Sequence, residues 1–237
     1  MDSCIFCKII KGDIPSSTIY EDENVKVILD IAPAAKGHAI LLVKEHVANV
    51  FELQADLAAK IFAVVPKVAS AIKEELGDDM KIFAEDLGII TPEVEALRDE
   101  CGFPGMKVLQ FGFEAWPTDP FYPHNFKTTN CICYTGTHDN NTTFGWYEDA
   151  KEEARDRVRR YLNCDGGNVS WDFIRLAMSS IAKYAIYPMQ DVLRLGSEAR
   201  MNVPGVLGAN WAWRFEEKDL QEWHATELKK MTQLFNR

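Results

Sequence analysis

Two carboxylates follow apolar segments in the second half of the chain, and these residues could carry out acid–base chemistry. Glu85 comes directly after KIFA (81–84), and Asp139 comes shortly after NCICYTG (130–136). Because the C-terminal ends of parallel strands meet at one edge, we expect Glu85 and Asp139 to lie there together. Two carboxylates close together suit general acid–base chemistry, in which one of them gives and then takes a proton. The alternative is that an acid at a strand end serves only as a helix cap.

A second candidate site lies near the N-terminus, where thiols and an imidazole have the spacing of metal ligands. Cys4 and Cys7 form a C-x-x-C motif, and His46 follows a later apolar run. Two thiolates and a histidine can share one zinc ion, although a closed structural site takes four ligands and no fourth is evident. The alternative is that both cysteines are small buried hydrophobic residues.

The elements around this cysteine pair form an α+β pattern over residues 1–77. The segments VKVILD (25–30) and HAILLV (38–43) are rich in β-branched residues and predict two strands joined by a turn. Apolar residues then recur at spacings of three and four over 57–76, which predicts a helix with one apolar face. We expect Pro66 to kink this helix and Gly77 to end it.

From residue 81 the pattern becomes strand, loop and helix, repeated. The expected strands are KIFA (81–84), MKVLQFGF (106–113) and NCICYTG (130–136). The expected helices are PEVEALRDEC (92–101), a charged helix over 147–162, a helix capped by Ser170, and a terminal helix from residue 219 that carries His224 on its surface. This order is typical of a parallel α/β sheet or barrel.

Length, composition and charge exclude several classes of protein. The 237 residues suit one large domain or two small ones, and the 47% hydrophobic content is that of a globular protein. With 26 Lys and Arg against 36 Asp and Glu, the net charge of -10 argues against a nucleic-acid partner, because an acidic body repels phosphate. No stretch approaches the roughly 20 apolar residues of a membrane span, and no signal peptide is evident. We therefore expect a soluble, cytoplasmic protein whose six scattered cysteines are reduced thiols or metal ligands.

The first half of the chain resembles the opening part of the histidine-triad (HIT) nucleotide hydrolases. The resemblance rests on CIFCKIIKGDIPSSTIYEDENVKVILDIAPAAKGHAILLVKEH (4–46) and continues to about residue 77. It implies an α+β half of a HIT-like domain, in which Cys4, Cys7 and His46 can bind a structural zinc and Asp30 lies where the family holds a nucleotide ribose. The family's catalytic histidines occupy alternate strand positions. The five histidines here are His38, His46, His124, His138 and His224, and no two are separated by one residue. We therefore expect no nucleotide hydrolysis.

The second half resembles 4-α-glucanotransferase (amylomaltase, or disproportionating enzyme) over residues 81–237. The resemblance rests on the segments AEDLGIITPEVEALRDECGFPGMKVLQFGF (84–113), PHNF (123–126), YTGTHDNNTTFGWY (134–147) and YPMQDVLRLGSEARMNVPGVLGANWAWRF (187–215). The resemblance implies the C-terminal part of a (β/α)8 TIM barrel over 78–237. It also implies retaining transfer of α-1,4-glucan segments between maltooligosaccharides, with no cofactor required.

The same resemblance assigns roles to individual residues. It implies that Glu85 is the general acid/base, that Asp139 stabilises the transition state and that His138 contacts a sugar hydroxyl. It also places His124, Asn125 and Asn140 on the substrate side, with a loop-ordering hydrogen bond as the equal alternative for His124. Trp211 and Trp213 could stack on sugar rings, or they could be packing residues.

One component of this family's chemistry is missing from the chain. The nucleophilic aspartate belongs to an earlier strand in an Arg-x-Asp-His type motif, and no such motif occurs here. A (β/α)8 barrel typically needs about 250 residues, and residues 81–237 supply roughly its last four strands. A sheet of these strands alone does not close into a barrel, so we expect two unpaired edge strands that can pair with another chain. The chain reads as the start of one protein joined to the end of another, by gene fusion, frameshift or assembly error. We expect no turnover by it alone, and the alternatives are a glucan-binding remnant and a nucleotide- or zinc-binding module.

Overall fold

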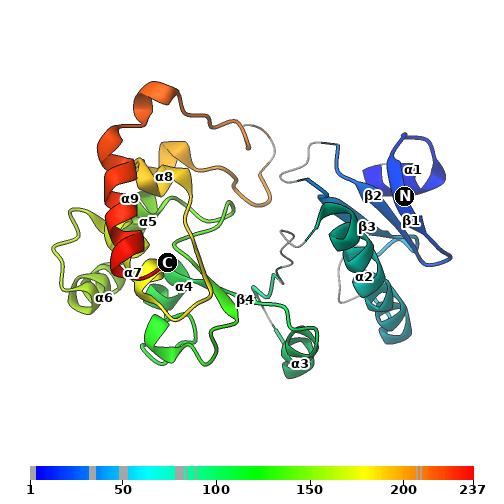
Figure 1. The fold of residues 1–237 in the computed structure, drawn as a ribbon, viewed down its shortest axis with the longest axis horizontal. Helices are drawn as coiled ribbons and strands as arrows, with labels where there is room; N and C mark the ends of the chain where they lie inside the picture. The colour runs from blue at the N-terminus through cyan, green and yellow to red at the C-terminus, as the bar shows by residue number, and fades with distance from the viewer. Residues whose placement is uncertain are drawn as a thin grey trace. The chain divides into compact units, whose positions relative to one another are not determined.

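A computed structural model describes residues 4–31, 36–47, 53–77, 83, 85–88, 90–206, 208 and 210–237. The chain divides into two units, Met1–Ile82 and Phe83–Arg237 (Figure 1). Among the described residues, each unit has its own three-stranded sheet. The mixed α/β class predicted from the sequence is confirmed. The predicted strand KIFA lies outside the described residues, apart from Phe83.

The first unit is an antiparallel sheet with a long helix packed against it (Figure 1). Its elements are α1 (Ile5–Lys11), β1 (Ser17–Glu21), β2 (Val25–Leu29), β3 (Ala39–Val43) and α2 (Ala55–Leu76). Strands β2 and β3 pair with Val25 opposite Val43, which matches the two predicted strands. Helix α2 continues through Pro66, and Leu57, Ile61 and Val64 on its apolar face pack with Val25 and Val27. It ends at Gly77, whose φ of +83° is a conformation that favours glycine.

The second unit contains a parallel sheet in which strand order follows chain order. Its strands are β4 (Gly105–Val108), β5 (Cys131–Tyr134) and β6 (Tyr184–Ile186). Gly105 pairs with Cys131, and Ile132 pairs with Tyr184. Since the strands are parallel, their C-terminal ends open onto the same edge, where the loops after β5 and β6 begin.

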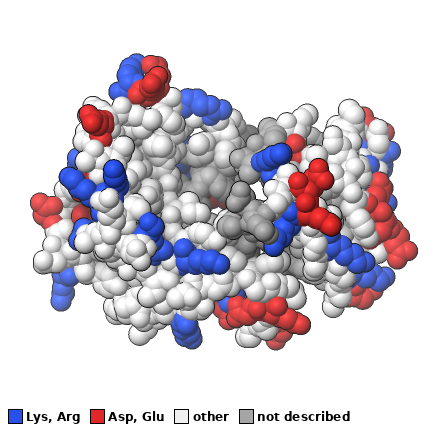
Figure 2. Space-filling model, in the orientation of Figure 1, with Lys and Arg blue, Asp and Glu red and all other residues white. Residues whose placement is uncertain are grey.

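Short and long helices surround this sheet. They are α3 (Pro92–Glu100), α4 (Leu109–Glu114), η2 (Pro123–Asn125), α5 (Thr143–Asp149), α6 (Glu152–Leu162), α7 (Val169–Ser179), α8 (Met189–Val192), η3 (Ser197–Ala199), η4 (Glu217–Asp219) and α9 (Glu222–Leu234). Figure 2 shows acidic side chains gathered over α3, which carries Glu93, Glu95, Asp99 and Glu100. Among the described residues, none of the helices is both long enough and apolar enough to cross a membrane.

Several predicted elements are wrong in detail. The strand expected over 106–113 ends at Val108, because Leu109 and Phe113, four residues apart, are buried on one face of helix α4. The charged helix expected over 147–162 is two helices, separated by the extended residues Ala150 and Lys151. Ser170 does not cap α7, because the helix begins one residue before it and Asn168 is the N-cap residue.

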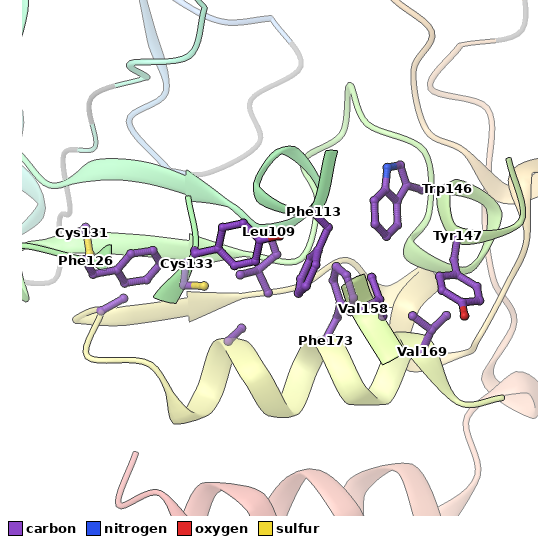
Figure 3. Close-up of a cluster of buried hydrophobic side chains, with 13 residues drawn as sticks. Leu109, Phe113, Phe126, Cys131, Cys133, Trp146, Tyr147, Val158, Val169 and Phe173 are labelled. Carbon is purple, nitrogen blue, oxygen red and sulfur yellow. The ribbon is translucent and has the colours of Figure 1, made fainter. Parts of the chain in front are cut away.

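Helix α7 is the centre of the second unit, because both of its faces are buried. Val169, Phe173 and Ala177 face one core cluster, and Figure 3 shows Phe113 reaching from α4 toward Phe173. The centroids of these two rings are 5.1 Å apart. The opposite face of α7 packs with the terminal helix α9 in a second cluster, made by Trp171, Ile174, Met178, Val192 and Met231.

The prediction that His224 lies on the surface is wrong. The residue is 7% exposed, and its ring centroid is 3.9 Å from that of Trp223. Its Nδ1 accepts a hydrogen bond from the backbone N–H of Gln221 at 3.0 Å. His224 therefore takes part in capping α9, a role that its exposed-helix sequence context does not reveal.

Candidate functional site

A pocket of about 1320 Å³ opens at the C-terminal edge of the parallel sheet. Its lining comes from the segments that follow the strands: Phe111 after β4, the loop 136–142 after β5, and Tyr187 after β6. Glu85 and Asp139 both line it, so the structure brings together the two carboxylates predicted from the sequence. The described residues that line this pocket belong to the second unit.

The acids at 85 and 86 are adjacent, and their surroundings differ. The side chain of Asp86 is only 7% exposed, and it accepts hydrogen bonds from Arg98 Nη1 at 2.5 Å and from the Met106 N–H at 2.7 Å. A Cβ at Gly105 would collide with this carboxylate, so β4 starts with a glycine there. Asp86 thus fixes the backbone against α3 and β4, while Glu85 is exposed at the pocket.

The charge of Glu85 acts on a tyrosine at the end of β5. Burial raises the pKa of Tyr134, and the negative charge of Glu85 raises it further. Tyr134 also lines the pocket. The hydroxyl of Tyr134 therefore remains a neutral hydrogen-bonding group over a wide pH range.

Asp139 is held by the segment 200–202, which is distant in sequence. Asn202 Nδ2 donates to Asp139 Oδ1 at 2.5 Å, and Arg200 Nη2 donates to the Asp139 carbonyl oxygen at 2.6 Å. The Asn202 N–H bonds the carbonyl oxygen of His138 at 3.1 Å. His138 Nε2 lies 3.4 Å from Asp139 Oδ1. The Asp139 side chain remains 47% exposed, so a bound molecule could contact it.

A buried acid closes the base of the loop that carries His138 and Asp139. Asp191 is fully buried and accepts hydrogen bonds from Thr135 Oγ1 at 2.5 Å, Thr143 N–H at 2.7 Å and Thr143 Oγ1 at 2.7 Å. Burial raises the pKa of the Asp191 carboxyl, and the bonds from the two threonines oppose that rise. Within the loop, Asn140 Oδ1 accepts from the N–H and the hydroxyl of Thr137, each at 2.8 Å. The loop is thus fixed at both ends and in the middle.

Two tryptophans contribute aromatic surface to the same pocket. The Trp211 ring centroid lies 5.0 Å from that of His138, and Trp211 is 54% exposed. Trp213 stacks on Phe215 with an interplanar angle of 28°. Both tryptophans line the pocket, where exposed ring faces could pack against apolar faces of a ligand.

The predicted substrate contacts His124 and Asn125 are not among the pocket-lining residues. His124 Nε2 lies 2.9 Å from the carbonyl oxygen of Pro117, so Nε2 donates and Nδ1 faces the Tyr161 hydroxyl at 2.9 Å. Asn125 Nδ2 donates to the carbonyl oxygens of Pro117 and Asp119, at 2.8 Å each. These bonds order the loop 117–125, as the alternative prediction for His124 describes. A direct sugar contact by either residue stays a prediction.

The first unit brings the predicted metal ligands together. One ligand atom each from Cys4, Cys7 and His46 lies within 4.8 Å of the others, and Cys7 Sγ is 3.1 Å from His46 Nδ1. A hydrogen bond from the Cys7 backbone lowers the pKa of the Cys4 thiol, whereas burial raises that of Cys7. Two sulfurs and an imidazole are a donor set that suits zinc. No His, Cys, Asp or Glu among the described residues provides a fourth ligand.

Asp30, the predicted ribose contact, pairs with a neighbouring histidine in the first unit. Its Oδ2 lies 3.3 Å from His38 Nδ1, and its N–H bonds the carbonyl oxygen of His38 at 3.0 Å. A nucleotide-binding role for Asp30 stays a prediction.

Sequence reasoning missed Arg200, Asn202 and Asp191, the residues that hold the loop carrying His138 and Asp139. They occur in a polar run, QDVLRLGSEARMN (190–202), and no local pattern there marks a partner more than 40 residues away. The useful signal was the concentration of Arg, Asn and Asp close after a strand end, where parallel α/β proteins collect functional groups.

Family models match both parts of the chain. Residues 51–220 match a model described as 4-alpha-glucanotransferase, and residues 3–86 match one described as scavenger mRNA decapping enzyme C-term binding. Among curated proteins, the chain is similar to the 4-alpha-glucanotransferase of Synechocystis sp., with 49% identity over 70% of this chain and 33% of that protein. It is also similar to that of Thermus thermophilus, with 48% identity over 72% and 35%. The chain thus spans about a third of the length of these relatives.

The chain is also similar to solved structures. The chain is similar to an amylomaltase from Streptococcus agalactiae in complex with acarbose, with a TM-score of 0.65 and 30% identity over 90% of this chain and 39% of that one. It is also similar to a HIT-family protein from Bacillus subtilis, with 52% identity over 31% and 52% of the two chains and a TM-score of 0.30. The two resemblances predicted from the sequence are confirmed.

Proposed function

With residues 51–220 matching its family model, the chain belongs to the 4-alpha-glucanotransferase family, and we propose that the pocket of its second unit binds α-1,4-glucans. The observation that carries the proposal is that Glu85 and Asp139 line one pocket with the exposed ring of Trp211. The acarbose complex of the similar amylomaltase supports an oligosaccharide ligand.

The chemistry of the two acids in this proposal follows from retaining sugar transfer. In a site that also supplied the nucleophile, Glu85 would protonate the glycosidic oxygen as its bond to the anomeric carbon breaks and the nucleophile bonds that carbon, and it would later take a proton from the acceptor hydroxyl. Asp139, held by Asn202, would stabilise the positive charge that develops on the sugar ring. His138 and Asn140 contact sugar hydroxyls. His124 and Asn125 order the loop 117–125 through their hydrogen bonds to Pro117.

We also propose that the second unit is the C-terminal part of a (β/α)8 barrel. Support comes from three parallel strands in chain order, joined by segments that contain helices. The pocket lies at the C-terminal ends of the strands, which is where such barrels carry their active sites.

We propose further that the 237-residue chain binds glucan without turning it over by itself. A retaining transfer passes through a covalent glycosyl intermediate, which needs a third acid as nucleophile. The sequence contains no Arg-x-Asp-His motif, which is where the family carries that aspartate. A fusion of two partial domains would explain why the chain carries Glu85 and Asp139 without the family's nucleophilic aspartate. Sequencing of the locus through codons 70–90 tests whether the reading frame is continuous.

Titration calorimetry with acarbose and maltoheptaose tests the glucan proposal. We expect saturable binding, weakened about threefold to tenfold in Trp211→Ala by loss of aromatic stacking. Trp116→Ala is the matched control, because Trp116 is 81% exposed and is not a lining residue of the pocket. Failure of the wild-type chain to bind either sugar would remove the proposed function.

Incubation with maltotriose tests turnover, and the appearance of longer and shorter oligomers would refute the proposed inactivity.

A second candidate function belongs to the first unit, where we propose zinc binding by Cys4, Cys7 and His46. The clustering of their ligand atoms within 4.8 Å favours it. Bound zinc would supply structural cross-linking between α1 and the segment after β3. Metal analysis of the purified chain should find near-stoichiometric zinc that is lost in Cys4→Ser and retained in Cys101→Ser, an exposed thiol of the second unit. Equal zinc content in the two variants would exclude this site.

A further inference from the structure

Cys4 and Cys7 lie within the first turn of helix α1. Cys4 is the N-cap residue, and its carbonyl oxygen accepts a hydrogen bond from the Lys8 N–H at 3.2 Å. Cys7 follows three positions later, a spacing that brings two side chains to the same side of a helix. The sulfur atoms of the two cysteines lie within 4.8 Å of each other.

This geometry suits a covalent bond between the two sulfurs. A disulfide bond is about 2.05 Å long and joins residues whose Cα atoms are about 4.4 to 6.8 Å apart. Two residues three positions apart on a helical turn have Cα atoms about 5 Å apart, which lies within that range. Rotation of the two side chains can therefore close the bond while the backbone of α1 stays in place.

Both thiols are also accessible to small molecules. Cys4 and Cys7 are each half-buried, whereas Cys131 and Cys133 of the second unit are 1% and 0% exposed. Cys101 is exposed as well, but the next cysteine along the chain is the buried Cys131. An oxidant that reacts with Cys4 or Cys7 thus leaves a second thiol within reach of the modified sulfur.

We propose that Cys4 and Cys7 are a redox-active pair, which exchange with a small-molecule disulfide such as oxidised glutathione converts reversibly into a disulfide. One thiolate attacks a sulfur of the glutathione disulfide, forms a mixed disulfide and expels one glutathione thiolate. The other thiolate then attacks the cysteine sulfur of the mixed disulfide, which closes the Cys4–Cys7 bond and expels the second glutathione thiolate. The pair gives up two electrons and two protons, and the glutathione disulfide is reduced to two thiols.

Oxidation of the pair would also release zinc, a consequence that rests on the zinc binding proposed above. Zinc is bound by thiolates, and the disulfide uses both sulfurs. His46 Nδ1, 3.1 Å from Cys7 Sγ, is the third ligand of the proposed zinc site, but the exchange needs no atom of His46. Removal of the imidazole therefore separates the two proposals.

Peptide mapping by mass spectrometry of the whole chain tests the redox pair. Metal-free protein is treated with a mixture of oxidised and reduced glutathione, quenched with acid and alkylated. We expect the peptide that contains Cys4 and Cys7 to lose two hydrogens and to carry neither an alkyl group nor glutathione. Dithiothreitol should restore two thiols that can be alkylated. A stable glutathione adduct on Cys4 or Cys7, or two unmodified thiols there while Cys101 carries glutathione, would overturn the proposal.

Three variants and a zinc assay complete the test. Cys7→Ser should stop the reaction at a glutathione adduct on Cys4, and Cys101→Ser should leave the yield of the Cys4–Cys7 disulfide unchanged. His46→Ala should lose its zinc and form the disulfide as the wild type does. In the zinc-loaded wild type, oxidised glutathione should release one zinc ion for each disulfide formed, measured with a chromophoric chelator. Disulfide formation by a chain that binds no zinc would refute the zinc site alone, and zinc binding without disulfide formation would refute the redox pair alone.

Discussion

The side-chain amide of Asn202 donates a 2.5 Å hydrogen bond to Oδ1 of Asp139, although the two residues are 63 positions apart in the chain. This bond orients one carboxylate oxygen, while nearly half of the Asp139 side chain remains exposed at the pocket. Asn202 is thus a positioning residue for the acid that we place beside the sugar ring.

Replacement of Asn202 should therefore weaken glucan binding more than it weakens the fold. For Asn202→Ala we expect about threefold weaker binding of acarbose and a loss of about 1 kcal/mol in the free energy of unfolding, the contribution of one hydrogen bond. Asn210→Ala is the control, because Asn210 bonds Val203 and Val206 in the same segment without bonding Asp139. Calorimetry and urea unfolding measure the two effects, and equal loss of sugar affinity in both variants would contradict the positioning role.

The buried carboxyl of Asp191 should make the stability of the second unit depend on pH. The pKa of this carboxyl is raised in the folded state above its unfolded value of about 3.9. At a pH between these two pKa values, the carboxyl keeps its proton in the folded state and has lost it in the unfolded state. The free energy of unfolding should consequently fall as pH rises through that interval. Asp191→Asn keeps the size of the side chain and does not titrate, so its pH profile should lack this decrease. Urea unfolding from about pH 4 upward compares the two, and parallel profiles would disprove the assignment.

Arg237 should stabilise the C-terminal end of helix α7. Its guanidinium donates to the carbonyl oxygens of Met178, Ser180 and Ala182, which lie at the end of this helix and just beyond it. We expect Arg237→Ala to lower the free energy of unfolding by about 2 kcal/mol, since hydrogen bonds from a charged donor are lost. Arg237→Lys keeps the charge and removes the forked geometry, so it should recover only part of the loss. If thermal melts of Arg237→Ala and wild type coincide, the contact contributes nothing.

The parallel sheet of the second unit should promote self-association. Among the described strands, β4 and β6 are each paired on one side only, and such edges can pair with another chain. Ile186 on β6 is 39% exposed, which adds apolar surface at one of these edges. Light scattering after size exclusion should show a mass that rises with protein concentration, and Ile186→Lys should reduce it. A monomer mass at all concentrations would refute this prediction.

Local sequence patterns determined the class of the protein and the position of its two carboxylates. Alternating apolar segments and polar strand ends are local signals, so they predicted the strands at 25–30 and 38–43 and placed Glu85 and Asp139 near one edge. Local signals failed where packing decided the conformation. The segment after Val108 turns into a helix because Leu109 and Phe113 are buried together, and His224 is buried with its ring next to those of Trp171 and Trp223.

Only the tertiary structure decided which residues hold the site. Asp191 bonds Thr135 and Thr143, and Asn202 bonds Asp139, because β5, β6 and the segments after them are brought to one edge of the sheet. Hydrogen bonds between residues about 50 to 60 positions apart leave no periodicity or spacing in the sequence, since they depend on where whole elements pack. The sequence by itself therefore named the chemical groups, and the packing of the sheet and its loops selected their partners.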